Sequence, residues 1–192
     1  VDSDDIISNA SCTTNCITPV VQILNEKFGV ERAFMTTIHS YTSTQNLVDG
    51  PHKDMRRARA AAHNIIPTST GAAKATTKVI KGLENVFDGI AVRVPTLAGS
   101  LSDITLDLKK ETSVEEINDT FVRAKDDIRF KNYLTCTYEP LVSSDIIGSP
   151  YSAVVDLNMT RVLDKDFVQV LAWYDNEWGY ASRLVDMATK VS

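Results

Sequence analysis

The sequence lacks the features that mark secreted, membrane and nucleic-acid-binding proteins. Its 192 residues include three cysteines, and an odd number does not suit a disulfide framework. No run of about 18 apolar residues is present, so we expect no membrane span. The acidic residues 1–5 do not resemble a signal peptide. The formal net charge of -5 argues against nucleic acid as the main partner. Together these absences predict a cytoplasmic protein.

A further absence concerns cofactors. No G-x-G-x-x-G stands between a strand and a helix, so we expect no dinucleotide-binding fold within this chain. We also expect no bound metal. The sequence is 43% hydrophobic and 23% charged, which is enough apolar material for a packed core.

The hydrophobic pattern predicts an α+β domain over residues 1–192, without repeats or linkers. Helices are expected over 17–28, 71–83, 113–124 and 178–191. Strands are expected over 30–41, 90–94, 104–108, 133–138, 153–163 and 167–174. Because few helices interrupt the strands, we expect a largely antiparallel or mixed sheet with helices on one face. Pro19 should kink the first helix or cost it a hydrogen bond, and residues 42–70 read as a long, ordered and functional loop.

Cys12 is the first candidate for chemistry. It lies where a strand turns into a helix, and the free N–H groups and partial positive charge of a helix start favour a thiolate. A nucleophile and a buried structural thiol are both open interpretations, and spacing does not choose between them. Cys16, one turn later, is interpreted as packing, and Cys136 as part of the core.

His39, at the end of a predicted strand, is the candidate base for that thiol. A lone histidine is more often a core residue, so this interpretation depends on its reaching Cys12. Small donors at a loop and a helix start suit phosphate oxygens, although capping is the simpler explanation. They are Thr42, Thr44, Thr68, Ser69, Thr70 and Gly71. Arg93 on an apolar strand requires an anionic partner. The basic run 53–59 is interpreted as a solvated face, or as a subunit or cofactor contact.

Five blocks in the same order resemble the phosphorylating glyceraldehyde-3-phosphate dehydrogenase family over nearly the whole chain. They are residues 8–15 (Ser-Asn-Ala-Ser-Cys-Thr-Thr-Asn), 37–42 (Thr-Ile-His-Ser-Tyr-Thr), 64–74, 93–96 (Arg-Val-Pro-Thr) and 173–180 (Trp-Tyr-Asp-Asn-Glu-Trp-Gly-Tyr). The resemblance implies the catalytic C-terminal domain of that family. It also implies that Cys12 and His39 are the catalytic pair.

The remaining roles are also implied by the resemblance. The site for inorganic phosphate would comprise Ser11, Thr13, Thr70 and Gly71. The site for the substrate's own phosphate would comprise Thr42, Thr44 and Arg93. Asn176 would hold the nicotinamide carboxamide, with Tyr180 near the ring. The implied reaction is glycolytic or gluconeogenic: an aldehyde is oxidised by NAD, with NADP not excluded. Inorganic phosphate then cleaves the resulting thioester of glyceraldehyde 3-phosphate.

Two departures from the family qualify these expectations. The family's dinucleotide-binding domain precedes the cysteine block, so we expect a fragment that is inactive alone, with helix 178–191 docking on the missing domain. Residues 97–103 replace the usual Asn-Val-Ser-Val-Val-Asp of a strand used in subunit contact, so the homo-oligomer expected of the full-length enzyme is uncertain for this chain. Erythrose-4-phosphate dehydrogenase, or a non-catalytic binding or assembly module, is the alternative.

Overall fold

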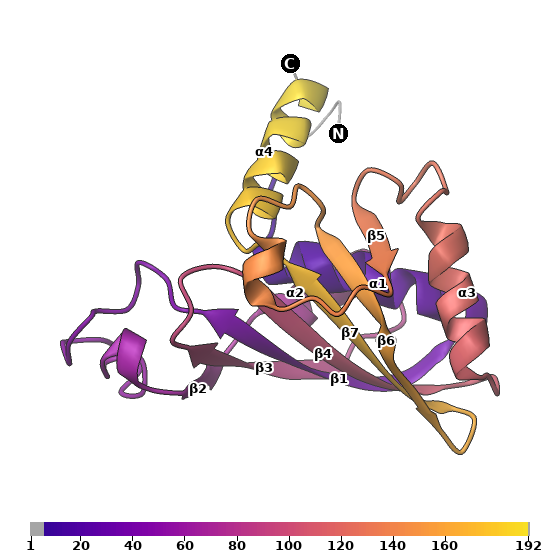
Figure 1. Ribbon diagram of the computed structural model, residues 1–192, viewed down its shortest axis with the longest axis horizontal. Coiled ribbons are helices and arrows are strands. Elements are labelled where there is room, and N and C mark those ends of the chain that lie inside the picture. Colours follow the sequence, from indigo (N-terminus) through magenta and orange to yellow (C-terminus); the bar gives the residue numbers. More distant parts are fainter. Residues whose placement is uncertain (1–5, 192) are drawn as a thin grey trace.

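In the computed structural model, which describes residues 6–191, seven strands form one sheet in the order β2-β3-β1-β4-β7-β6-β5 (Figure 1). The strands are β1 (Val30–Ser40), β2 (Ile66–Ser69), β3 (Phe87–Val94), β4 (Ser100–Leu108), β5 (Leu134–Thr137), β6 (Ala153–Leu163) and β7 (Phe167–Tyr174). The pairs β1–β3 and β5–β6 are parallel, and the other pairs are antiparallel. The predicted mixed, largely antiparallel sheet is therefore confirmed.

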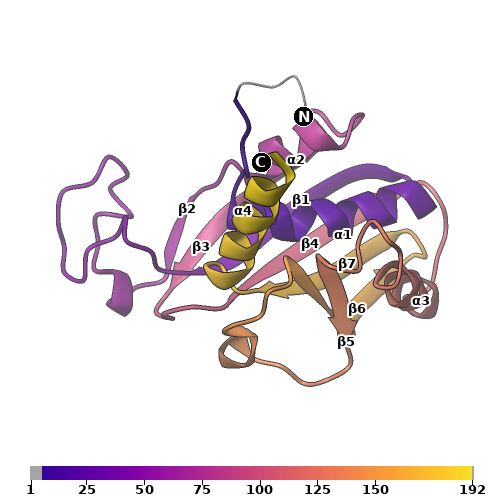
Figure 2. The same cartoon turned by 90° about the horizontal axis from the view of Figure 1, so that it is seen from above.

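Three helices cover one face of this sheet, as Figures 1 and 2 show: α1 (Cys12–Phe28), α2 (Ala72–Val79) and α3 (Val114–Ala124). The alternation along β4 explains why one face is covered, because every second residue from Ser100 to Leu108 is buried. The core lies between this face and α1, whose buried residues include Ile17, Val20 and Leu24. The predicted α+β architecture is confirmed.

Helix α1 begins earlier than its apolar pattern predicts and does not end at Pro19. The earlier start has a local cause, because the Ser11 hydroxyl accepts a hydrogen bond from the Thr14 backbone N–H at 3.1 Å. The helix ends at Gly29, whose φ of 73° closes the last turn. Cys12 is consequently the first residue of a long, buried helix.

The segment 42–70 is more structured than its sequence predicts. It contains strand β2 and a short 3₁₀ helix, η1 (Ala61–His63). Periodicity missed β2 because the strand is four residues long and includes Pro67, a residue that sheets accept at an edge. The strand carries Thr68 alongside Ala91 of β3.

Helix α4 (Trp178–Val191) projects away from the sheet (Figure 1). Gly179 is its only buried residue, while Leu184, Val185 and Val191 are half exposed or more. The start of the helix is fixed by Asp175, whose Oδ1 accepts hydrogen bonds from the N–H groups of Glu177 and Trp178 at 2.8 and 2.9 Å. Over residues 6–191, no helix has the length and apolar content needed to cross a membrane.

Candidate active site

A cavity of about 500 Å³ opens where α1 and α2 begin and β1 ends. Eight of the residues singled out from the sequence line it, namely Ser11, Cys12, Thr13, His39, Ser69, Thr70, Gly71 and Arg93. A second cavity, of about 510 Å³, lies between the segment 8–10, α1, α4 and residues 129–133, and contains no cysteine or histidine. The chemistry that the sequence suggests therefore belongs to the first cavity.

The two residues proposed for catalysis meet in this cavity. The Sγ atom of Cys12 lies 3.4 Å from Nε2 of His39, although 27 positions separate them in the chain. Cys12 is half-buried at the start of α1, while His39 is almost wholly buried near the end of β1. A thiol and an imidazole at this separation can exchange a proton.

The surroundings of His39 favour the tautomer that a base for Cys12 requires. Its Nδ1 lies 2.6 Å from the Ser40 carbonyl oxygen, so a proton on Nδ1 is donated there and Nε2 keeps its lone pair. Nη1 of Arg93 donates to the same oxygen at 3.0 Å and lies 2.9 Å from Nδ1. The contact with Nδ1 would be a hydrogen bond only in the opposite tautomer. The Arg93 guanidinium can donate to the Ser40 carbonyl oxygen in both tautomers, so its position does not require an unprotonated Nδ1. We therefore assign the proton to Nδ1.

Burial disfavours the charged form of both members of this pair. It lowers the pKa of His39 to about 4, with the nearby Arg93 charge acting in the same direction. Burial also raises the pKa of the Cys12 thiol, against the weaker opposing effects of Thr13 and Arg93. Burial therefore opposes the thiolate that the helix start favours. Transfer of the thiol proton to Nε2 of His39 would produce the nucleophile.

Tyr174, which the sequence did not single out for this role, connects the elements that carry Cys12 and His39. Its buried hydroxyl lies 2.8 Å from Oγ1 of Thr13 in α1 and 2.7 Å from Oγ1 of Thr37 in β1. Its ring meets the His39 ring edge-on, with centroids 6.0 Å apart. Within the motif at 173–180, this tyrosine looks like an ordinary core residue. Only its proximity to Thr13, Thr37 and His39 in the fold reveals its role, and the sequence contained no signal for that proximity.

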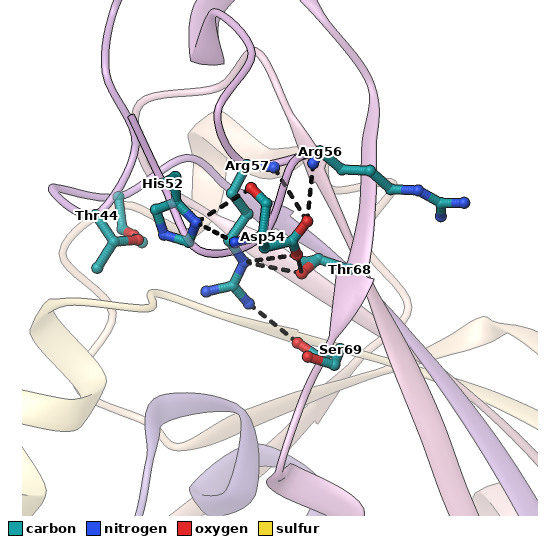
Figure 3. A network of polar contacts seen from close by, with 8 residues as sticks. Thr44, His52, Asp54, Arg56, Arg57, Thr68 and Ser69 are labelled. Carbon is teal, nitrogen blue, oxygen red and sulfur yellow. Dashed lines mark hydrogen bonds and ion pairs between the residues drawn. The ribbon is translucent and has the colours of Figure 1, made fainter. Parts of the chain in front are cut away.

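Arg57 lines the cavity, a position that the sequence did not predict. The basic run 53–59 was interpreted as a solvated face or a subunit or cofactor contact, and for Arg57 the structure corrects this. Its side chain lines the cavity with Cys12 and Arg93, and its Nε donates to Oγ1 of Thr68 at 2.8 Å (Figure 3). Four basic residues in seven positions gave no indication of which one turns inward, because the sequence did not predict β2.

The residues predicted for the substrate's phosphate are not all in one place. Arg93 lines the cavity, but Thr42 and Thr44 lie outside its lining, in the turn after β1, with their hydroxyl oxygens 3.0 Å apart. Thr70 is partly used within the fold, since its Oγ1 accepts from the Ala72 N–H at 3.2 Å. The cavity with Cys12 therefore contains the donors predicted for inorganic phosphate together with two arginines.

The two residues predicted for the cofactor lie at the base of α4. The Oδ1 atom of Asn176 accepts hydrogen bonds from Ser40 and Ser100 at 2.9 and 3.0 Å. This arrangement fixes the orientation of the amide and leaves its Nδ2 as a donor. Tyr180 is half-buried in the first turn of α4, where its carbonyl accepts from Nδ2 of Asn9 at 3.4 Å. The part of the chain that the structure describes contains no group of three or more His, Cys, Asp or Glu residues placed to hold a metal ion.

Comparison with known proteins gives a consistent result. Residues 11–176 match the family model described as glyceraldehyde 3-phosphate dehydrogenase, C-terminal domain. A glyceraldehyde-3-phosphate dehydrogenase of Mycobacterium avium is 54% identical over 189 residues, which cover 98% of this chain and 55% of that protein. One of Streptomyces coelicolor is 51% identical over 186 residues, covering 97% of this chain and 55% of the relative. The chain thus spans about half the length of the curated relatives it matches.

Proposed function

Because the chain belongs to the glyceraldehyde-3-phosphate dehydrogenase family, through that family's C-terminal domain, we propose that it is the catalytic domain of a phosphorylating enzyme. The enzyme oxidises glyceraldehyde 3-phosphate and transfers the acyl group to inorganic phosphate. The observation that carries this proposal is the 3.4 Å contact between Sγ of Cys12 and Nε2 of His39 in a cavity that also contains two arginines.

The first step is addition of the Cys12 sulfur to the aldehyde carbon. Nε2 of His39 takes the thiol proton, the new C–S bond forms, and the carbonyl oxygen becomes the oxygen of a hemithioacetal. The backbone N–H of Cys12, in the first turn of α1, would stabilise the charge on that oxygen together with His39. The imidazolium returns its proton to this oxygen, which becomes the hydroxyl of the hemithioacetal. His39 is then free to be the base for the hydroxyl proton when the carbon is oxidised to a thioester.

Oxidation requires a hydride acceptor, and Asn176 and Tyr180 fit a nicotinamide cofactor. The Asn176 amide is held by Ser40 and Ser100 so that its nitrogen is left to donate, which suits the carboxamide oxygen of a nicotinamide. When bound, NAD accepts the hydride, and NADP is the alternative. The chain's own contribution is to orient the ring and to hold the proton at His39.

Phosphorolysis completes the proposed reaction. A phosphate oxygen attacks the thioester carbon, the C–S bond breaks, and the sulfur leaves as the Cys12 thiolate with an acyl phosphate as the product. Ser11, Thr13, Thr70 and Gly71 would bind the attacking phosphate. Arg93 would bind the phosphate of the substrate from within the cavity, and Thr42 and Thr44 would contact it from the turn after β1, outside the cavity lining. Two anion sites are required because both reactants carry phosphate.

Two exposed apolar surfaces support proposals about assembly. We propose that α4 docks on a cofactor-binding domain, because Leu184 and Val185 are 49% and 62% exposed. The sheet face opposite the helices exposes Phe34 at 71% and Ile90 at 49%, which supports homo-oligomer formation.

The cysteines among residues 6–191 are free, which suits a cytoplasmic enzyme. The two relatives described above carry the glyceraldehyde-3-phosphate name, and this favours that substrate over erythrose 4-phosphate.

An activated ester tests the thiol chemistry without a hydride acceptor. p-Nitrophenyl acetate should release about one equivalent of nitrophenol per chain in a rapid burst as Cys12 is acetylated. Inorganic phosphate should then accelerate loss of the acetyl group and yield acetyl phosphate. Mass spectrometry would locate the acetyl group.

The matched controls are Cys12→Ser and Cys136→Ser. The first should abolish the burst, and the second should leave it unchanged. A burst of equal size in Cys12→Ser, or deacetylation that does not respond to phosphate, would contradict the proposed function.

A further inference from the structure

The side chain of Arg57 is held beside the cavity by Ser69, which lines it, and by Thr68, which does not. We propose that Thr68, oriented by Asp54, is a positioning residue that holds the Arg57 guanidinium ready for inorganic phosphate. The inference rests on the proposed function and extends it to residues outside the cavity.

Three contacts define this arrangement (Figure 3). Nε of Arg57 donates to Oγ1 of Thr68 at 2.8 Å, and Nη2 donates to the Ser69 carbonyl at 3.0 Å. The Thr68 hydroxyl in turn donates to Oδ2 of Asp54 at 2.5 Å. A hydroxyl has a single proton, so donating it to the carboxylate directs the oxygen lone pairs toward Arg57.

Asp54 is itself fixed by the backbone around it. Its Oδ1 accepts from the N–H groups of Arg56 and Arg57 at 2.8 and 3.4 Å, and its own N–H donates to Nδ1 of His52 at 2.9 Å (Figure 3). The hydrogen bond from Thr68 contributes most to lowering the pKa of Asp54, so the carboxylate is charged at neutral pH. The acceptor that orients Thr68 is therefore permanently present under physiological conditions.

These contacts leave part of the guanidinium free for an anion. Within residues 6–191, the hydrogen bonds of Arg57 use Nε and Nη2, and none uses Nη1. Thr68 is buried on β2, opposite Ala91 of β3, which lines the cavity. A free arginine would lose its rotational freedom on binding phosphate, whereas an arginine held in place has already lost it.

The charge of Asp54 acts against this benefit. Its Oδ2 lies 3.8 Å from Nε of Arg57, so the carboxylate partly neutralises the guanidinium and repels an incoming anion. A substitution of Asp54 would change position and charge together. Replacing Thr68 removes the bridge at constant charge, and Thr68 is therefore the residue to test.

The test measures binding of inorganic phosphate to the full chain by isothermal titration calorimetry. Thr68→Val should weaken binding about three- to ten-fold, the range expected for loss of one hydrogen bond, while Thr68→Ser retains the hydroxyl and should restore it. Thr68→Ala is the second variant should valine disturb β2. Iodoacetamide labelling of Cys12 without phosphate reports on the rest of the site and should not change.

Asp49→Asn is the matched control. Asp49 makes an equivalent pair with Arg59, at 3.0 Å, and also accepts a backbone N–H, but neither residue lines the cavity. Its substitution should leave phosphate affinity unchanged. The double variant Thr68→Val with Arg57→Ala should bind phosphate no more weakly than Arg57→Ala alone, because Thr68 acts through the Arg57 side chain.

Three outcomes would overturn the inference. They are an unchanged phosphate affinity in Thr68→Val, a loss from Thr68→Val that persists in full without Arg57, and an equal weakening of phosphate binding in Asp49→Asn. If instead the unaltered chain binds no phosphate, the proposed function fails, and the inference fails with it. The first three results would leave the proposed function standing.

Discussion

The two walls of the Cys12 cavity are constructed differently. The deep wall, formed by Cys12, Thr13 and His39, lies on the first turn of a 17-residue helix and near the end of an 11-residue strand. The outer wall, formed by Arg57, Ser69, Thr70 and Gly71, belongs to residues 51–71, where the longest regular element is the four-residue strand β2. Packing positions the deep wall, whereas side-chain hydrogen bonds position the outer wall.

This difference separates two requirements of the proposed reaction. Sulfur and imidazole must stay at a fixed distance, and long elements anchored in the core provide that rigidity. Phosphate must enter and leave, and a polar segment at the sheet edge can bind it without disturbing the core. Mutations in the two walls should therefore differ in kind: the deep wall should control reactivity and stability, and the outer wall should control anion affinity.

The largest expected effect lies within the deep wall. Iodoacetamide should modify Cys12 at least about 100-fold faster than Cys16, because alkylation requires an accessible thiolate. Cys16 lies one turn further along α1, is fully buried, and has its pKa raised by that burial. Peptide mass spectrometry after brief labelling would measure both rates. His39→Asn should slow the labelling of Cys12, and equal rates for both cysteines would show that the helix start gives no advantage.

The pH dependence of stability should also distinguish the walls. The pKa of His39 is about 4 in the folded chain against 6.5 as the usual value, so the folded state resists protonation. Above pH 6.5 His39 is neutral in both the folded and the unfolded chain, so it does not lower the free energy of unfolding. As the pH falls toward 4, the unfolded chain takes up the proton more readily, and the free energy of unfolding decreases by roughly 2–3 kcal/mol. The pKa of Asp54 is lowered from 3.8, so the corresponding loss in the outer wall occurs below that value.

Urea denaturation of the unaltered chain and of His39→Asn between pH 7 and pH 4 would measure this term. The variant should show a shallower decline, because the term specific to His39 is removed. Parallel curves for the two proteins would contradict the assignment of that pH range to the deep wall.

Tyr174→Phe should have the next largest effect. It removes a hydroxyl bonded to Thr13 and Thr37 and leaves both of their oxygens short of a partner, at a cost of roughly 1–2 kcal/mol in the free energy of unfolding. Tyr138→Phe is the control, since Tyr138 is 58% exposed. Thermal or urea denaturation would compare the two, and equal stability would weaken the distinction between the walls.

Arg57→Ala should have the smallest effect on stability, below about 1 kcal/mol, because its ion pair with Asp54 is long and partly exposed. Phosphate affinity should nevertheless fall by more than it does in Tyr174→Phe. Urea denaturation would show which of the two variants loses more stability, and calorimetry would show which loses more phosphate affinity. If the same variant lost more of both, the contrast between the walls would be removed.

The sequence predicted most of the fold because its long elements carry clear apolar periods. Strand β7 and helix α3 follow the predicted bounds closely, since each buries one side along its length. Strand β6 also has its predicted bounds, although its first five residues are all buried. Strand β4 alternates as predicted but begins four residues before the predicted start at 104. Strand β2 was missed because pairing with β3, rather than its own pattern, keeps four residues extended. Local patterns reveal burial within an element, but they do not reveal a partner that is distant in the sequence.

The same limit applies to the site. Local motifs identified Cys12, His39 and Arg93, and the parallel register of β1 and β3 places His39 opposite Arg93. The roles of Tyr174 and Arg57 depend on contacts across the fold. Motif position groups Thr42 and Thr44 with Arg93. They lie in the turn after β1, outside the lining of the Arg93 cavity, and their role in phosphate binding stays a prediction.

The hydroxyl bridge between Thr13 and Tyr174 spans 161 positions in the chain. During synthesis on a ribosome, the cysteine emerges long before the strand that completes its surroundings. Until β7 inserts between β4 and β6, α1 lacks part of the sheet on which it packs. A nascent chain would therefore expose an ordinary thiol first and acquire its final reactivity late, when the last strand closes the sheet.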